Sequence, residues 1–333
     1  MSTTVSVRNS NIELARLVSI LMVLLLHSNF LCLPVPTELS GSALLRLTLQ
    51  ALCIIGVDVF VFITGWYGTR PRRVSLARLL FICLFYGLIE IGLQFYFDTF
   101  SLRSLDILSF QSWFVADYLG LLCFTPVLNA FVASATRRQY QAVLLGLFLF
   151  QTWSDVLPGW NQDFLHGYSI LSMMLLYLLA RYARVHGLPT WIREKAGTLY
   201  LLCTAVIVLL ACFFLLQGKA INRAYFYTSP WVILSAVACF FFFEKHPIRP
   251  SRFINHLAQS CLAILLIHTD SLYVYMKRYF VYIWNDYAGI GLALMWGLGI
   301  TALATAGILV DQLRLLLWNK GVAKLPWLRR HER

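Results

Sequence analysis

An arginine and a histidine on one predicted membrane helix are the first residues whose types and spacing suggest chemistry. Arg16 precedes the apolar run LVSILMVLLLHSNFLCL, and His27 lies inside that run, eleven positions further on. At about 100° per residue, eleven steps return to within about 20° of the starting direction, so both side chains share one helix face, about 16 Å apart along the axis. Glu13 lies one turn before Arg16 and can pair with it. Ionisable side chains inside membrane spans are costly and usually functional, so this stripe predicts a base within the membrane and a cation near its surface.

The segment GVDVFVFITGWYGTRPRR, residues 56–73, combines an acid inside an apolar run with a cationic end. Asp58 should face the interior of a helix bundle, because a carboxylate facing lipid is unfavourable. The arginines that end this segment and follow it are Arg70, Arg72, Arg73 and Arg78. Guanidinium groups bind phosphate oxygens in pairs, so the cluster predicts either a phosphate-bearing ligand or attraction to anionic lipid headgroups.

Two later segments also hold polar residues within apolar surroundings. FQSWFVADYLGLLCFTP contains Trp113 and Asp117 near the start of a predicted span, with Pro126 inside it. LAQSCLAILLIH contains Ser260 and His268. His268 lies well inside its run and is therefore expected to be buried, a position that suits a structural histidine as well as a functional one.

The elements that must position these residues are apolar runs of membrane length. The sequence is 59% hydrophobic and 13% charged, which is typical of a polytopic helical membrane protein and not of a soluble domain. We expect an all-α fold of about ten transmembrane helices in one membrane-embedded domain, residues 1–333. The runs fall near 14–33, 45–67, 76–97, 112–132, 140–156, 168–184, 197–216, 226–243, 258–280 and 288–310.

The basic residues predict the orientation of these helices. With the N-terminus in the cytoplasm, 21 of the 27 Lys and Arg residues lie in cytoplasmic connections or tails. The remaining six lie on the other side: Arg46, Arg103, Lys219, Arg223, Lys277 and Arg278. This asymmetry predicts that both termini are cytoplasmic. Because the net charge of +12 is spread over the connections, it is attributed to topology, and no nucleic-acid partner is expected.

Taken together, these patterns resemble the acyltransferase-3 family, bacterial integral-membrane acyltransferases that modify cell-surface glycans. The resemblance extends over essentially the whole chain. It rests on Glu13 with Arg16-x10-His27, the GVDVFVFITGWYG segment, the Arg70-x-x-Arg73 pair, the stretch from Trp113 to Pro126, and SCLAILLIH. The family usually has an aspartate where Glu13 stands, and often reads PLFFxISG around the position of Asp58.

The resemblance implies transfer of an acyl group, most commonly acetyl, from cytoplasmic acyl-CoA to a hydroxyl of a cell-surface, exported or lipid-linked glycan. It implies a multi-pass protein of the bacterial inner membrane, with acyl-CoA as substrate and no permanently bound cofactor or metal. His27 would be the general base, with Glu13 and Arg16 completing the catalytic group. Arg70, Arg73 and Arg16 would bind acyl-CoA, while Asp58, Trp113, Ser260 and His268 are candidates for acceptor binding or support.

Three alternatives stay open at this point, of which a purely structural membrane subunit has the least support. A membrane-bound O-acyltransferase would rely on one deeply placed histidine, here His268, but would leave the Arg16–His27 stripe unexplained. A transporter or flippase would use intramembrane His and Asp residues as a proton relay, yet the two halves lack matching Gly- or Pro-broken helices. Sequence signatures of P-loop, zinc-protease and serine-hydrolase sites are missing.

Overall fold

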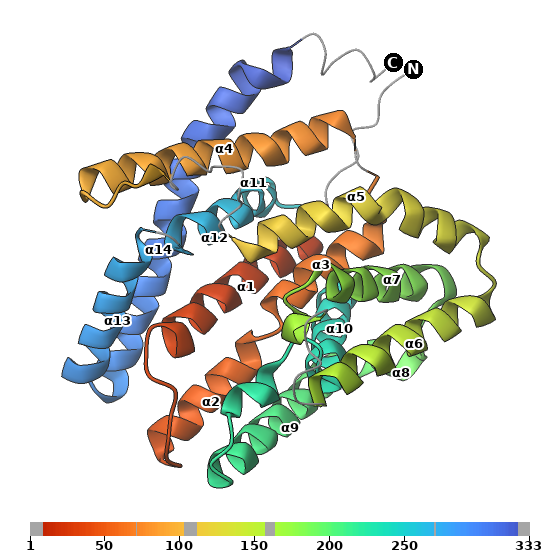
Figure 1. The fold of residues 1–333 in the computed structure, drawn as a ribbon, viewed down its shortest axis with the longest axis horizontal. Coiled ribbons are helices and arrows are strands. Elements are labelled where there is room, and N and C mark those ends of the chain that lie inside the picture. The colour runs from red at the N-terminus through yellow and green to blue at the C-terminus, as the bar shows by residue number, and fades with distance from the viewer. Residues whose placement is uncertain (1–8, 71, 103–111, 157–163, 270, 326–333) are drawn as a thin grey trace. The chain divides into compact units, whose positions relative to one another are not determined.

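The computed structural model describes residues 9–70, 72–102, 112–156, 164–269 and 271–325. Over these residues the chain forms helices and no strand, which confirms the all-α prediction. The chain divides into two compact units (Figure 1). Unit 1 contains Met1–Thr69 and Val127–Gln259, and unit 2 contains Arg70–Pro126 and Ser260–Arg333. One boundary falls at Pro126, inside α5 (Trp113–Ser134), where the proline cannot donate a helix hydrogen bond.

Seven helical segments of the described residues are long and apolar enough to cross a membrane. They are Ser10–Leu31, Gly41–Tyr67, Arg73–Tyr96, Trp113–Ser134, Ala196–Leu216, Ile221–Lys245 and Gly289–Lys324. The bent pair Arg252–Thr269 and Tyr273–Asp286 makes eight if it is one broken span. Every predicted apolar run falls on a helix. However, α7 (Ile170–His186) has 17 residues and is therefore about 26 Å long at 1.5 Å per residue. This length is short for a hydrocarbon core of about 30 Å. The number ten therefore stays a prediction.

Unit 1 is built around α3 (Gly56–Tyr67). This helix packs against α1 (Ser10–Leu26), α7 and α10 (Pro230–Lys245) (Figure 1). A Cβ at Gly65 would lie 2.6 Å from the carbonyl oxygen of Tyr177, so only glycine permits the observed approach of α3 to α7. The other helices of unit 1 are α2 (Gly41–Cys53), α6 (Arg137–Val156), α8 (Thr190–Glu194), α9 (Ala196–Leu216) and α11 (Arg252–Leu257).

Hydrogen bonds show which helix ends of unit 1 lie together. At one end, Asn11 Nδ2 donates to the carbonyl oxygen of Phe243 at 2.8 Å, which joins the start of α1 to the end of α10. There, too, Arg181 near the end of α7 bonds the end of α3. At the other end, Tyr225 donates to the carbonyl of Leu47 at 3.1 Å. We call these the arginine end and the histidine end, after Arg16 and His27. The predicted orientation requires that the helix ends predicted to be cytoplasmic lie together in unit 1, and that the opposite ends also lie together.

Unit 2 contains α4 (Arg73–Tyr96), α12 (Cys261–Thr269), α13 (Tyr273–Asp286), α14 (Gly289–Lys320) and the first part of α5. Ile82, Tyr86 and Ala263 form a buried cluster between α4 and α12. The helix α14 continues ten residues beyond the predicted run, which ended at 310. Arg314, which was counted with the cytoplasmic tail, thus lies on this helix and is buried, while its side of the membrane stays a prediction. Its Nε and Nη2 bond the two carboxylate oxygens of Asp311 at 2.5 and 2.8 Å. Because Asp311 pairs with it, the arginine can be buried and the helix can continue past it.

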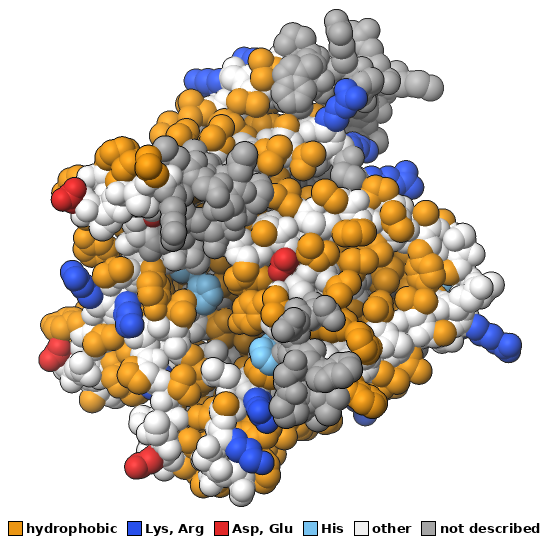
Figure 2. Space-filling view, viewed as in Figure 1, with side chains coloured by type: hydrophobic (Ala, Val, Ile, Leu, Met, Phe, Trp, Pro, Cys, Tyr) orange, Lys and Arg blue, Asp and Glu red, His pale blue; other side chains and the backbone are white. Residues whose placement is uncertain are grey.

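The surface of both units fits a lipid solvent. Figure 2 shows hydrophobic side chains over most of the visible face, with few charged side chains among them. Exposed leucines recur along α9 and α14, for example Leu201 and Leu209 on α9, and Leu294 and Leu298 on α14. Exposed apolar surface of this extent is unfavourable in water and favourable in a bilayer.

Candidate active site

The helix α1 carries the predicted stripe. It runs unbroken from Ser10 to Leu26, and His27 still has right-handed helical dihedral angles, φ −68° and ψ −38°. The eleven-residue interval from Arg16 to His27 is thus helical throughout, as the argument for a shared face requires. His27 is half-buried, at the opposite end of the helix from Arg16.

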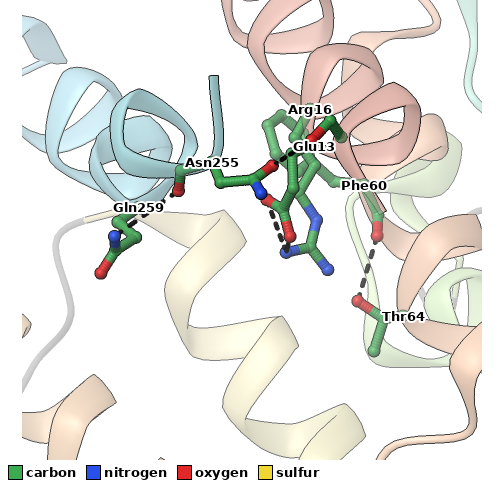
Figure 3. A network of polar contacts seen from close by, with 7 residues as sticks. Glu13, Arg16, Phe60, Thr64, Asn255 and Gln259 are labelled. Carbon is green, nitrogen blue, oxygen red and sulfur yellow. Dashed lines mark hydrogen bonds and ion pairs between the residues drawn. The ribbon is translucent and has the colours of Figure 1, made fainter. Parts of the chain in front are cut away.

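Glu13 and Arg16 form an ion pair at the arginine end (Figure 3). Arg16 Nη1 lies 3.4 Å from each carboxylate oxygen of Glu13. The relative exposure of the arginine side chain is 34%, while that of the glutamate side chain is 9%. Charge-assisted hydrogen bonds are usually about 2.7–2.9 Å long, so this pair is loose and the guanidinium keeps donor capacity for a ligand.

Hydroxyl and amide groups surround this pair. Ser10 Oγ donates to Asn255 Oδ1 at 2.9 Å, which fixes α11 to the first turn of α1. In Figure 3 the Arg16 side chain lies between Gln259, whose amide is 3.5 Å from the carbonyl of Asn255, and Thr64 of α3. Thr64 donates to the carbonyl of Phe60 at 3.0 Å. The polar contacts drawn in Figure 3 thus combine neutral hydroxyl and amide groups with the Glu13 carboxylate.

Two further arginines lie at the same end and were expected only to set orientation. Arg181 Nη1 is 3.4 Å from the carbonyl oxygen of Trp66, and its buried Nε has no hydrogen-bond partner among the described residues. The guanidinium carbon of Arg184 lies 4.9 Å from the centre of the Trp66 ring. Arg16 and Arg184 both lie within electrostatic reach of the Tyr67 hydroxyl. We refer to Arg16, Arg181 and Arg184 as the arginine cluster.

The local backbone explains how the arginine cluster forms. Gly68 ends α3 with φ 66°, a left-handed conformation that favours glycine. A Cβ at Gly68 would lie 2.7 Å from Nη1 of Arg181, so a side chain would displace the guanidinium. Arg181 and Arg184 are three residues apart on α7, and this spacing puts both on one face. That spacing is the sequence signal that could have revealed them.

His27 begins a π-helical turn that the sequence did not predict. This turn, η1, covers His27–Leu31, and the N–H of Cys32 donates to the carbonyl of His27, five residues earlier, at 3.1 Å. Such turns are rare and occur frequently at functional sites. The candidate base therefore occupies the point at which the helix changes its hydrogen-bond pattern.

Asp58 lies in the interior of unit 1, as predicted. Its residue exposure is 1%, and its Oδ2 has no hydrogen-bond partner in the described part of the chain. A Cβ at neighbouring Gly56 would lie 2.7 Å from the carbonyl oxygen of Ser19, which places this turn of α3 beside the middle of α1. Tyr168 and Tyr227 lie within electrostatic reach of the carboxylate.

The other predicted site residues belong to unit 2. Arg70 and Arg73 are exposed at the start of α4, and Trp113 begins α5. Ser260 Oγ donates to Asp311 Oδ2 at 2.8 Å, so this hydroxyl belongs to the buried Asp311–Arg314 group. His268 is buried, and its Nδ1 lies 2.5 Å from the carbonyl oxygen of Ile264. The structure thus gathers Glu13, Arg16, His27 and Asp58 in unit 1, and it assigns the remaining candidates to unit 2.

Comparison with known proteins identifies the family. A family model described as an acyltransferase domain, that of the acyltransferase-3 family, matches residues 9–310, which include most of both units. No curated protein and no solved structure gives a significant match. The match begins just before α1 and confirms the resemblance seen in the sequence. With its apolar spans, the chain is a multi-pass membrane protein that belongs to the acyltransferase-3 family.

Proposed function

We propose that the protein transfers an acyl group, in the first instance acetyl, from cytoplasmic acyl-CoA to a hydroxyl of a cell-surface or exported glycan. Membership of the family supports acyl transfer. The observation that carries the fuller proposal is the single helix α1, which has the Glu13–Arg16 pair at one end and His27 at the other. A separation of about 16 Å along the axis is about half of a hydrocarbon core of about 30 Å. It suits a donor whose phosphates stay at one membrane surface while its thioester reaches a base within the membrane.

The arginine end is the proposed binding site for the phosphates of acyl-CoA. Coenzyme A carries several phosphate groups, and guanidinium groups bind phosphate oxygens in pairs. In unit 1, Arg16 is loosely paired and Arg181 has a buried N–H without a partner among the described residues, so both can donate to a phosphate. Arg70 and Arg73 of unit 2, which are exposed, are proposed as further phosphate ligands because their spacing matches the family pattern.

His27 is the proposed general base. Its neutral imidazole takes the proton of the acceptor hydroxyl as that oxygen attacks the thioester carbonyl, and the C–O bond forms. Collapse of the tetrahedral intermediate breaks the C–S bond, and the imidazolium returns the proton to the departing thiolate of CoA. The same base can serve a route through an acyl-enzyme, in which the acyl group is first transferred to a protein side chain.

Labelled acetyl-CoA tests the proposal directly. In inverted membrane vesicles, label should move from acetyl-CoA to glycan, and the surface polysaccharide of cells that lack the gene should lose the acyl group. Accumulation of labelled substrate without transfer to glycan would instead indicate a transporter.

Sidedness is tested within unit 1, in a background in which the eight native cysteines are replaced. Thr190 is exposed near the arginine end, and Ser42 is exposed at the histidine end. In intact cells, Thr190→Cys should be shielded from an impermeant thiol reagent and Ser42→Cys should be labelled. The reverse pattern would place the arginine cluster away from cytoplasmic CoA and would contradict the proposed donor site.

A further inference from the structure

The π-helical turn at His27 is held by a buried polar group on α2. Asn29, at the centre of the turn, has no exposed surface. Its Nδ2 donates to the carbonyl of Arg46 at 2.9 Å and to Oε1 of Gln50 at 3.1 Å, while its Oδ1 accepts from Arg46 Nε at 2.9 Å. Three hydrogen bonds thus join one side chain of the turn to a single stretch of α2.

Arg46 was counted among the six basic residues of the non-cytoplasmic side, and its burial was not predicted. It lies within α2 with 6% of its surface exposed, because Asn29 bonds its Nε and Phe30 covers its guanidinium at 5.6 Å from the ring centre. Phe30 in turn packs edge-on against Tyr225, with ring centroids 5.7 Å apart. A buried arginine is costly unless its surroundings stabilise it, and these contacts stabilise Arg46. We refer to Asn29, Arg46 and Gln50 as the amide clamp.

The geometry of the clamp bears on His27. Side chains two residues apart on a helix point in nearly opposite directions, so Asn29 and His27 leave the turn on opposite sides. Since Asn29 points to α2, His27 is presented on the face away from α2. A π turn is less favourable than an α turn and persists where surrounding contacts determine it. The clamp supplies such contacts two residues beyond the candidate base.

We infer that the amide clamp is the positioning element for His27: Asn29, Arg46 and Gln50 fix the π turn against α2 and thereby set the direction of the imidazole. The inference rests on the proposed role of His27 as base. It assigns no contact with substrate to the clamp, which acts through His27. Its removal should therefore change the chemical step and the reactivity of His27, and leave donor binding at the arginine end unchanged.

The test uses the full-length protein in detergent. Asn29→Leu keeps a similar volume and removes all three hydrogen bonds, whereas Gln50→Glu retains an oxygen that accepts from Asn29. Thr48→Val is the matched control, because the Thr48 side chain lies on α2 and, among the described residues, bonds the carbonyl of Leu44 in its own helix at 2.8 Å. We expect Asn29→Leu to lower kcat by about 10- to 100-fold with little change in the KM for acyl-CoA, as is typical when the support of a catalytic group is removed. The single variant Gln50→Glu should retain most of the wild-type rate, and Thr48→Val should behave as the wild type.

A double-mutant cycle separates positioning from general support of the fold. If the clamp acts through His27, Asn29→Leu should have no further effect on the rate when His27 is already alanine. An effect of equal size in both backgrounds would overturn the inference, as would a wild-type kcat for Asn29→Leu.

A second measurement does not depend on acyl transfer. The rate at which diethyl pyrocarbonate modifies His27 is followed by peptide mass analysis, at a temperature well below the melting temperature of every variant. This rate should change several-fold in Asn29→Leu and should not change in Thr48→Val. If the wild type transferred no acyl group but this rate still responded to Asn29, the proposed function would fail and the positioning would stand. An unchanged modification rate would overturn the positioning whatever the activity.

Discussion

The two ends of α1 are built in opposite ways. At the arginine end, Arg16 pairs with Glu13 at 3.4 Å, and its side chain is one-third exposed. At the histidine end, Asn29 and Arg46 are buried and bond each other at 2.9 Å. A loosely paired cation can exchange its partner for a phosphate at small cost, whereas a buried and well-bonded turn resists displacement. Under the proposed function, this difference means that the donor would bind at an adaptable surface, whereas the proposed base would be fixed in advance.

The largest effect should come from the histidine end. His27→Ala should lower kcat by about 10²- to 10⁴-fold, the usual contribution of general acid–base catalysis. Binding of acyl-CoA should be unchanged, because the arginine cluster is on the order of 16 Å away along α1. Single-turnover kinetics and equilibrium binding of CoA measure the two quantities separately.

His256→Ala is the matched control, because His256 is exposed on α11 and is not one of the proposed catalytic or donor-binding residues. It should transfer acyl groups at the wild-type rate. Near-normal transfer by a well-expressed His27→Ala protein would exclude His27 as the base. The difference between the two ends of α1 would then have no role in catalysis.

An intermediate effect is expected at the arginine end. Arg16→Ala and Arg181→Ala should each weaken the binding of acyl-CoA by about 1.5–3 kcal/mol, the range for hydrogen bonds to charged groups, with a smaller change in kcat. Titration calorimetry with CoA and with dephospho-CoA would show whether one phosphate accounts for the loss. If both variants bind CoA as the wild type does, while vesicles of anionic lipid bind them less well, the cluster is a lipid anchor.

The sequence predicted one end of α1 better than the other. The Arg16–His27 stripe and the Glu13 pair follow from helix periodicity within one segment, so both could be predicted from local spacing. The π turn could not, because its stabilising contacts come from Arg46 and Gln50 on the next helix. Arg46 was predicted only by its side of the membrane, whereas its burial involves contacts with Asn29, 17 residues earlier, and with the Phe30 ring.

In unit 2, local sequence spacing indicates some of the buried polar contacts but not all of them. Arg314 was counted with the cytoplasmic tail because it follows the last predicted apolar run, which ended at 310. Asp311, three residues earlier, pairs with it inside α14, a spacing that is visible in the sequence. The further bond from Ser260 to Asp311 joins segments 51 residues apart, and no local pattern indicates it. Runs and periodicity thus predicted the helices, while the polar contacts that join helices required the structure.

The smallest effect should distinguish the two arginines of α7. Arg184 is exposed and lies over the Trp66 ring at 4.9 Å, so we expect it to attract CoA phosphates as an exposed charge, which is worth up to about 1 kcal/mol. Arg184→Ala should therefore weaken CoA binding by only about two- to fivefold. The loss should vanish as salt approaches about 1 M, where the Debye length falls to about 3 Å. The effect of Arg181→Ala should persist in salt, since Arg181 is partly covered by Gly68 and bonds the Trp66 carbonyl. CoA affinities measured from low to high ionic strength give both slopes, and equal slopes would contradict the distinction between a screened and a sheltered arginine.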